Sequence, residues 1–224
     1  MTLIVFVRCQ DGCILASDRK ATAEGSGLAQ EEQKSKVFAN GYAVGGAGDA
    51  SAVKSLLTRL EEQPLTAMDA VKFTKDQLEV WNQTSRIAVR CIVLVARNGG
   101  VDASVVETSD FSTSTNSISS PFHCVGVPAS VAVARHYLSK RNYETKTCEN
   151  AAPEILAILK QACEKMEFVG KQEDYGFDII IFRPTDYVYK TRITTEWAVL
   201  TNEIRPIEGT SPQFSFTPFG GGAS

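Results

Sequence analysis

The hydrophobic pattern at the start of the chain predicts a run of β-strands joined by tight turns. Apolar and β-branched residues fill each segment, as is typical of strands. Asp11-Gly12 and Asn40-Gly41 separate neighbouring segments and are strong hairpin signals. A stretch rich in Gly and Glu at 23–33 is expected to be a loop. The strands are expected at 3–9, 13–17, 36–39 and 42–44. Together these segments predict an antiparallel sheet.

After this sheet, the apolar spacing lengthens to that of an amphipathic helix. Asp49 is a good N-cap for the first helix, and Pro64 interrupts its pattern. A second helix is expected to begin near Thr66, and its apolar spacing fades at 82–85. The apolar stripe of the first helix is formed by Val53, Leu56, Leu57 and Leu60.

The second half of the chain again alternates between runs of strands and a pair of helices. The later strands are expected at 87–96, 101–106, 122–127, 177–182 and 187–193. Two helices are expected at 128–138 and at about 149–168, and Pro128 suits the first turn of the earlier one. The segment 110–120 is rich in Ser and Thr without a period, which predicts a loop.

This order of elements predicts the fold class. Runs of strands and runs of helices, rather than strict alternation, argue against a doubly wound parallel sheet. The pattern favours an α+β fold in four layers (αββα), with two packed antiparallel sheets and helices on both outer faces. A single domain is expected over 1–205, followed by a tail rich in Pro, Gly and Ser at 206–224.

Composition and charge exclude several classes of function. A chain of 224 residues with 43% hydrophobic residues is long enough for one domain with a sizeable core. The formal net charge of -3 and the absence of Lys or Arg runs argue against a nucleic-acid partner. The apolar start at 3–7 is too short to span a bilayer, and it lacks the features of a secretory signal. We therefore expect a cytoplasmic protein without a membrane partner.

Cysteine and histidine usage gives no sign of a metal or cofactor site. The six cysteines form no C-x-x-C unit, and four of them lie inside apolar runs, where a free thiol behaves as a small hydrophobe. The two histidines, His123 and His136, are too few for a His-rich metal site. The segment Gly45-Gly46-Ala47-Gly48 fails the phosphate-binding fingerprint because Ser51 replaces its last glycine. We expect no cofactor and no metal.

Three motifs in the first fifty residues resemble a known family. The stretch from Thr2 to Thr22 is similar to the start of a mature proteasome β subunit, which opens with threonine, a strand, a turn, and a strand ending A-x-D-R before A-T. Lys34-Ser35-Lys36-Val37-Phe38 and Ala47-Gly48-Asp49-Ala50 resemble two later segments of that family, in the same order. The resemblance implies the N-terminal-nucleophile (Ntn) hydrolase fold, in a divergent member of prokaryotic or archaeal type.

The chemistry that this resemblance implies starts at Thr2. A threonine hydroxyl is a poor nucleophile and needs a base within hydrogen-bond reach. At a chain start the α-amine can serve as that base, since its unperturbed pKa of about 7.7–8.0 is close to neutrality. Met1 blocks this role, and threonine is small enough for the initiator Met to be removed. Thr2 would then be the first residue of the mature chain.

The resemblance also implies roles for residues around Thr2. Asp18 matches the family's acidic residue, which fixes and charge-pairs a lysine. Lys36 is predicted to be that lysine, with Lys34 as the second choice, and its charge would lower the proton affinity of the hydroxyl and amine. Gly48 matches the glycine whose backbone N–H forms the oxyanion hole.

Two segments of the second half depart from the family pattern. The serine-rich segment that steadies the terminal amine corresponds to Val125-Gly126-Val127-Pro128-Ala129-Ser130, in which only Ser130 offers a hydroxyl. Further on, D-x-x-S-G-G corresponds to a segment that keeps Asp174 and lacks the serine. Ser130 and Asp174 complete the predicted catalytic set.

Three functions stay open at this point. The first is a threonine-type Ntn hydrolase that cleaves peptide or amide bonds through an ester on Thr2. The second is a transpeptidase that passes the same ester to an amine, like the proteasome-like connectases of methanogenic archaea. The third is a non-catalytic structural subunit that retains Met1. The expected partner is a peptide or protein substrate, and the resemblance also implies a homo-oligomeric ring or proteasome-like partner subunits.

Overall fold

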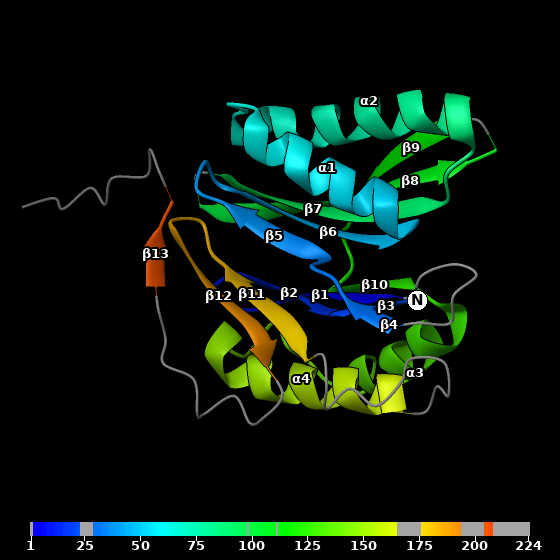
Figure 1. Cartoon of the computed structure of the whole chain (residues 1–224). Coiled ribbons are helices and arrows are strands. Elements are labelled where there is room, and N and C mark those ends of the chain that lie inside the picture. Colours follow the sequence, from blue (N-terminus) through cyan, green and yellow to red (C-terminus); the bar gives the residue numbers. More distant parts are fainter. Residues whose placement is uncertain are drawn as a thin grey trace, which may run out of the picture.

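The protein folds into four layers, with two β-sheets packed face to face between two pairs of helices (Figure 1). The structure is a computed structural model and describes residues 2–22, 29–97, 99–110, 112–164, 176–193 and 204–207. The predicted α+β class with two antiparallel sheets flanked by helices is therefore confirmed.

The first sheet contains the chain start as an interior strand. Its order is β10-β1-β2-β11-β12-β13, and all of its pairings are antiparallel. The hairpin of β1 and β2 was predicted from Asp11-Gly12, and its register pairs Val7 with Ile14. Its strands are β1 (Leu3–Arg8), β2 (Cys13–Asp18), β10 (Phe122–Gly126), β11 (Phe177–Phe182), β12 (Asp186–Ile193) and β13 (Ile204–Pro206).

The second sheet runs β5-β6-β7-β8-β9 and is also antiparallel. A separate two-stranded sheet pairs β3 with β4. The members of the larger sheet are β5 (Ser35–Phe38), β6 (Tyr42–Gly48), β7 (Val89–Arg97), β8 (Gly100–Ser109) and β9 (Ser112–Ser117). The short strands are β3 (Lys20–Thr22) and β4 (Ala29–Glu31).

Helices cover the outer face of each sheet. The helices α1 and α2 lie over the second sheet, and α3 and α4 lie over the first (Figure 1). Asp49 caps α1 as predicted, since its carboxylate accepts a hydrogen bond of 3.0 Å from the N–H of Ala52. The four helices are α1 (Ala50–Glu62), α2 (Ala67–Ser85), α3 (Pro128–Leu138) and α4 (Cys148–Glu164).

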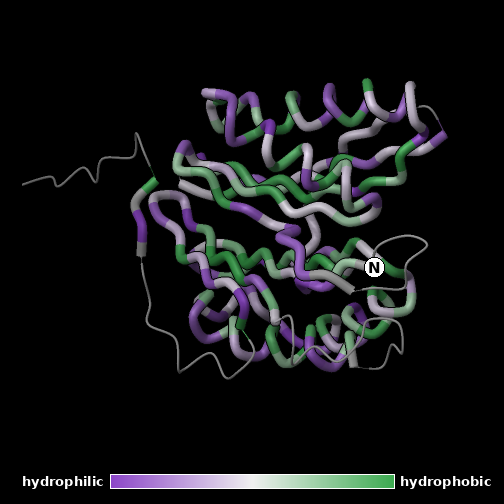
Figure 2. The backbone as a smooth tube through the Cα atoms, in the orientation of Figure 1, coloured by the Kyte–Doolittle hydropathy of each residue, from purple (hydrophilic) through white to green (hydrophobic). Residues whose placement is uncertain are grey.

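Three apolar layers separate the four structural layers, and β1 contributes to two of them. Leu3, Val5 and Val7 pack toward α3 and α4, whereas Ile4 and Phe6 pack toward the second sheet. Both faces of β1 are therefore buried, which explains why its sequence is a continuous apolar run instead of an alternating one. The hydropathy colouring of Figure 2 shows the same apolar strands in the middle of the molecule.

Two predicted loops contain strands. The segment 110–120 includes β9, which pairs with β8 at the edge of the sheet. Four of its six side chains are exposed, so the strand lacks the apolar alternation that would have identified it. The predicted loop at 23–33 includes β4, which comprises three residues. In both places, pairing with a neighbouring strand forms the element without an apolar signal.

The C-terminal boundary of the sheet lies slightly beyond the predicted end of the domain. β13 pairs with β12, and the side chain of Ile207 is buried against the core between the sheets. The rest of the predicted tail lies outside the described residues, as does the predicted end of the helix after Glu164. No helix in the described part of the chain is long and apolar enough to cross a membrane.

Candidate active site

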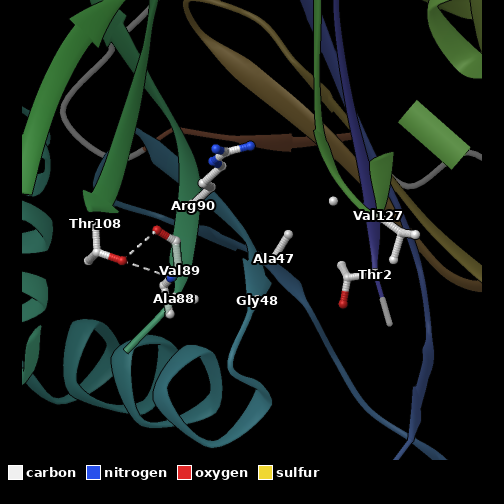
Figure 3. A pocket seen from close by; sticks show the side chains of 9 residues that line it. Thr2, Ala47, Gly48, Ala88, Val89, Arg90, Thr108 and Val127 are labelled. Carbon is white, nitrogen blue, oxygen red and sulfur yellow. Dashed lines mark hydrogen bonds between the residues drawn. The ribbon is translucent and has the colours of Figure 1, made fainter. Parts of the chain in front are cut away.

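Thr2 lies beside a pocket of about 300 Å³ at one end of the two sheets. Thr2 precedes β1, and its carbonyl accepts a hydrogen bond of 3.0 Å from the N–H of Val127. Figure 3 shows its side chain on the side of the pocket opposite β7, near the end of β6. The pocket is lined by Thr2, Ala47, Gly48, Ala88, Val89, Arg90, Thr108, Gly126 and Val127. Thr2 and Gly48, which were singled out from the sequence, therefore face one cavity.

A buried ion pair adjoins the chain start. Asp18, at the end of β2, is fully buried, and Lys34 is 3% exposed. The Lys34 Nζ donates to Asp18 Oδ2 at 2.7 Å and also donates to the carbonyl of Lys20. The other Asp18 oxygen accepts a hydrogen bond of 2.6 Å from the N–H of Leu3. Asp18 thus joins a buried ammonium to the first amide after Thr2.

The prediction that Lys36 pairs with Asp18 is wrong, and the second choice, Lys34, holds that position. Lys36 Nζ instead pairs with Glu61 of α1 at 2.6 Å, on the outer side of the second sheet. Within β5 the side chains alternate, so Ser35 faces inward and Lys36 faces outward. Lys34 precedes the strand and is not bound by this alternation, which lets its side chain reach Asp18.

A serine pair holds Lys34 in place. The hydroxyls of Ser17 and Ser35 lie 2.9 Å apart, and both side chains are fully buried. The carbonyl of Lys34 accepts a hydrogen bond of 2.9 Å from the N–H of Gly46. These contacts fix the residues on either side of the Asp18–Lys34 pair to both sheets. Sequence reasoning missed them, although Ser17 in an otherwise apolar strand was a signal for a buried polar partner.

A second buried polar cluster lies beside Asp18 in the first sheet and was also missed. Asp178 of β11 pairs with Ser17 in the ladder and is fully buried. Its carboxylate accepts hydrogen bonds from the Arg19 guanidinium at 2.7 and 2.8 Å and from the Thr191 hydroxyl at 2.7 Å. Burial raises the pKa of Asp178, and the donated hydrogen bonds from Thr191 and Arg19 oppose that rise. The cluster anchors the end of β2, where Asp18 lies.

Two glycines at the pocket have conformations that other residues rarely adopt. Gly48 has φ +121°, and an added Cβ would lie 1.8 Å from the carbonyl oxygen of Ala88. Gly126 has φ +138°, and an added Cβ would lie 2.0 Å from the carbonyl oxygen of Thr2. Both positions therefore require glycine, because a side chain would push apart the backbones that border the pocket.

Gly126→Ala tests this requirement. We expect the substitution to lower the free energy of unfolding by at least about 2 kcal/mol, since it combines an unfavourable φ with a backbone clash. Denaturant unfolding followed by circular dichroism measures the change. Gly100→Ala is the matched control, because a Cβ there meets nothing within 4 Å and the φ is not positive. Equal stability of the two variants would contradict the steric argument.

Of the two remaining predicted residues, the structure describes only Ser130, which does not line the pocket. Ser130 is buried in the first turn of α3, three residues beyond Val127, and is not among the residues that line the pocket. Asp174 lies outside the described residues. Within the described part of the chain, no group of three or more His, Cys, Asp or Glu side chains could hold a metal ion.

Comparisons with models of known protein families and with curated proteins find no match for this chain. The resemblance to the Ntn family therefore rests on the sequence motifs.

Proposed function

We propose that this chain is a threonine-type Ntn hydrolase that cleaves peptide or amide bonds through an ester on Thr2 once Met1 has been removed. The observation that carries the proposal is the buried Lys34–Asp18 pair, which is hydrogen-bonded to the amide of Leu3, directly after Thr2. A buried ion pair is costly to desolvate and contributes little net stability, so its presence beside a nucleophile-type residue points to a chemical role.

The proposed reaction begins with attack of the Thr2 Oγ on the carbonyl carbon of the scissile amide. The hydroxyl proton passes to the α-amine of Thr2, and the nearby positive charge of Lys34 favours its loss. The tetrahedral oxyanion would accept a hydrogen bond from the backbone N–H of Gly48. When the C–N bond breaks, the leaving amine takes the proton from the α-ammonium, and the acyl group remains on Thr2 as an ester. Water then attacks the ester carbonyl and gives a proton to the α-amine; the acyl C–O bond to Thr2 breaks, the carboxylic acid leaves, and the proton returns to the Thr2 Oγ to regenerate the hydroxyl.

The intact mass of the purified chain tests this proposal. We expect the mass to lack Met1 and to increase by one adduct after treatment with a β-lactone, because a nucleophilic hydroxyl attacks the lactone carbonyl and the C–O bond of the ring breaks. Retention of Met1 together with no adduct would contradict the proposal and favour a non-catalytic structural subunit.

The same experiment distinguishes hydrolysis from acyl transfer. If a labelled chain releases the acyl group into water, the adduct disappears in buffer alone. If it disappears only when an amine is added and the acyl amide accumulates, the chain acts as a transpeptidase through the same ester. The favoured outcome is loss of the adduct in buffer.

A further inference from the structure

The pocket beside Thr2 is lined mostly by small or apolar residues and by a single charged residue among those that the structure describes. Most of its residues are small or apolar, and they leave space without offering side-chain hydrogen bonds. The Thr108 hydroxyl, which could have offered one, accepts from the N–H of Val89 at 2.9 Å and donates to the carbonyl of Ile87 at 2.7 Å. Arg90 is the one charged residue among the described lining residues. Its guanidinium is therefore the strongest polar group that the pocket offers to a bound molecule.

The guanidinium of Arg90 retains donors for a ligand. Its Nε pairs with Glu107 of β8 at 3.0 Å, and Glu107 is its one ion-pair partner among the residues that the structure describes. The Arg90 side chain is 59% exposed. Figure 3 shows it extending from β7 on the side of the pocket away from Ala88. Since arginine has five N–H donors, the pair with Glu107 leaves most of them available.

The positive charge of Arg90 also acts on His123, on β10. Burial is the main cause that lowers the pKa of His123, and the positive charge of Arg135 comes next; Glu107 opposes the shift, and Arg90 makes the smallest contribution to it.

We propose that the substrate segment in this pocket carries a carboxylate, which the free N–H groups of Arg90 bind. The inference rests on the proposed function and adds a substrate class to it. A carboxylate and a guanidinium match in charge and in planar geometry, and the pair can form two parallel hydrogen bonds. Arg90 would thus be a specificity-determining residue beside the nucleophile.

The test compares β-lactones that differ only at the end of one side chain. In each pair of reagents, one side chain ends in a carboxylate and the other in the isosteric carboxamide. Two such pairs are made, which carry the side chain on one or the other of the two substitutable carbons of the lactone ring. The second-order rate of Thr2 labelling is measured by intact mass. We expect the wild-type chain to react about fivefold to tenfold faster with the carboxylate in one of the two placements. This preference should decrease with added salt, because the contact is partly exposed.

Arg90→Gln is expected to reduce the preference to about one while the carboxamide rate stays unchanged. Arg97→Gln is the matched control: Arg97 lies at the other end of the same strand and pairs with Asp102 of β8 in a similarly exposed ion pair. Both variants lose a surface arginine. The inference is supported if Arg90→Gln loses the preference for the carboxylate reagent and Arg97→Gln keeps it. Equal effects of the two substitutions would overturn it.

The outcomes separate the inference from the proposed function. If Thr2 is labelled at equal rates by carboxylate and carboxamide in the wild type, the carboxylate preference is refuted and the nucleophile stands. If neither these reagents nor an uncharged β-lactone labels Thr2, the proposed function is refuted and the inference is refuted with it.

Discussion

Thr2→Val is expected to abolish labelling by a β-lactone without lowering the melting temperature. Valine keeps the branched shape of threonine and replaces only the hydroxyl, which is the atom that would attack the reagent. Intact mass gives the extent of labelling, and thermal unfolding followed by circular dichroism gives the stability. We expect labelling to fall to the uncatalysed level, a loss of at least about 1000-fold, because the nucleophile itself is removed.

The control for this experiment is Thr2→Ser, which keeps a hydroxyl at the same position and should retain measurable labelling. Cysteine thiols are strong competing nucleophiles for a β-lactone, but all six are buried. Burial raises the pKa of Cys13, Cys91 and Cys124 to about 12, so their thiols stay protonated near neutral pH. Persistent labelling of Thr2→Val would place the nucleophile elsewhere in the chain.

Lys34→Met is expected to reduce both reactivity and stability. Methionine is of similar length and lacks the charge, so Asp18 would keep a buried carboxylate without its counterion. Breaking a buried pair in this way costs about 3–5 kcal/mol. We expect the labelling rate at Thr2 to fall by at least about 100-fold, because the positive charge that favours deprotonation of the nucleophile is lost. Denaturant unfolding and labelling kinetics measure the two effects.

Lys36→Met provides the matched control, since Lys36 is two residues away and was the lysine favoured by the sequence. Its partner Glu61 has a side chain that is 60% exposed, and exposed pairs contribute only about 0–1 kcal/mol. We expect this variant to keep its reactivity and most of its stability. The double variant Lys34→Met with Asp18→Asn removes both charges and should recover part of the stability but none of the reactivity. A larger loss of reactivity in Lys36→Met than in Lys34→Met would contradict the assignment.

Local patterns were sufficient to predict most of the architecture. The Asp11-Gly12 and Asn40-Gly41 turns identified two hairpins, and the Asp49 cap identified the start of α1, because each signal depends on neighbouring residues alone. β9 was missed for the opposite reason. An edge strand with exposed Ser and Thr side chains is stabilised by its partner strand, and no apolar period in the sequence reports that pairing.

The types of residue in the candidate site could be predicted from the sequence. The exact position of the lysine could not. Thr2, Asp18 and Gly48 came from motifs, and the structure brings Thr2 and Gly48 to one pocket and Asp18 to the adjoining ion pair. The choice between Lys34 and Lys36 depends on where β5 begins, and strand boundaries are not resolved by composition. The Arg19–Asp178 cluster joins residues far apart in the sequence, so only the three-dimensional pairing of β2 with β11 reveals it.

The hydrogen bonds on both sides of the peptide group between Thr2 and Leu3 have a consequence for exopeptidases, which we expect to stop at Thr2. The ends of a chain are normally poorly ordered, and an aminopeptidase must bind several residues that are not hydrogen-bonded to the rest of the protein. The N–H of Leu3 donates to Asp18, and the carbonyl of Thr2 accepts from the N–H of Val127, so the peptide group between Thr2 and Leu3 is held on both sides. Trimming beyond Thr2 would require β1 to leave the interior of its sheet, which amounts to unfolding the domain. In a chain from which Met1 has been removed, the stability of the whole fold would thereby keep Thr2 as the first residue.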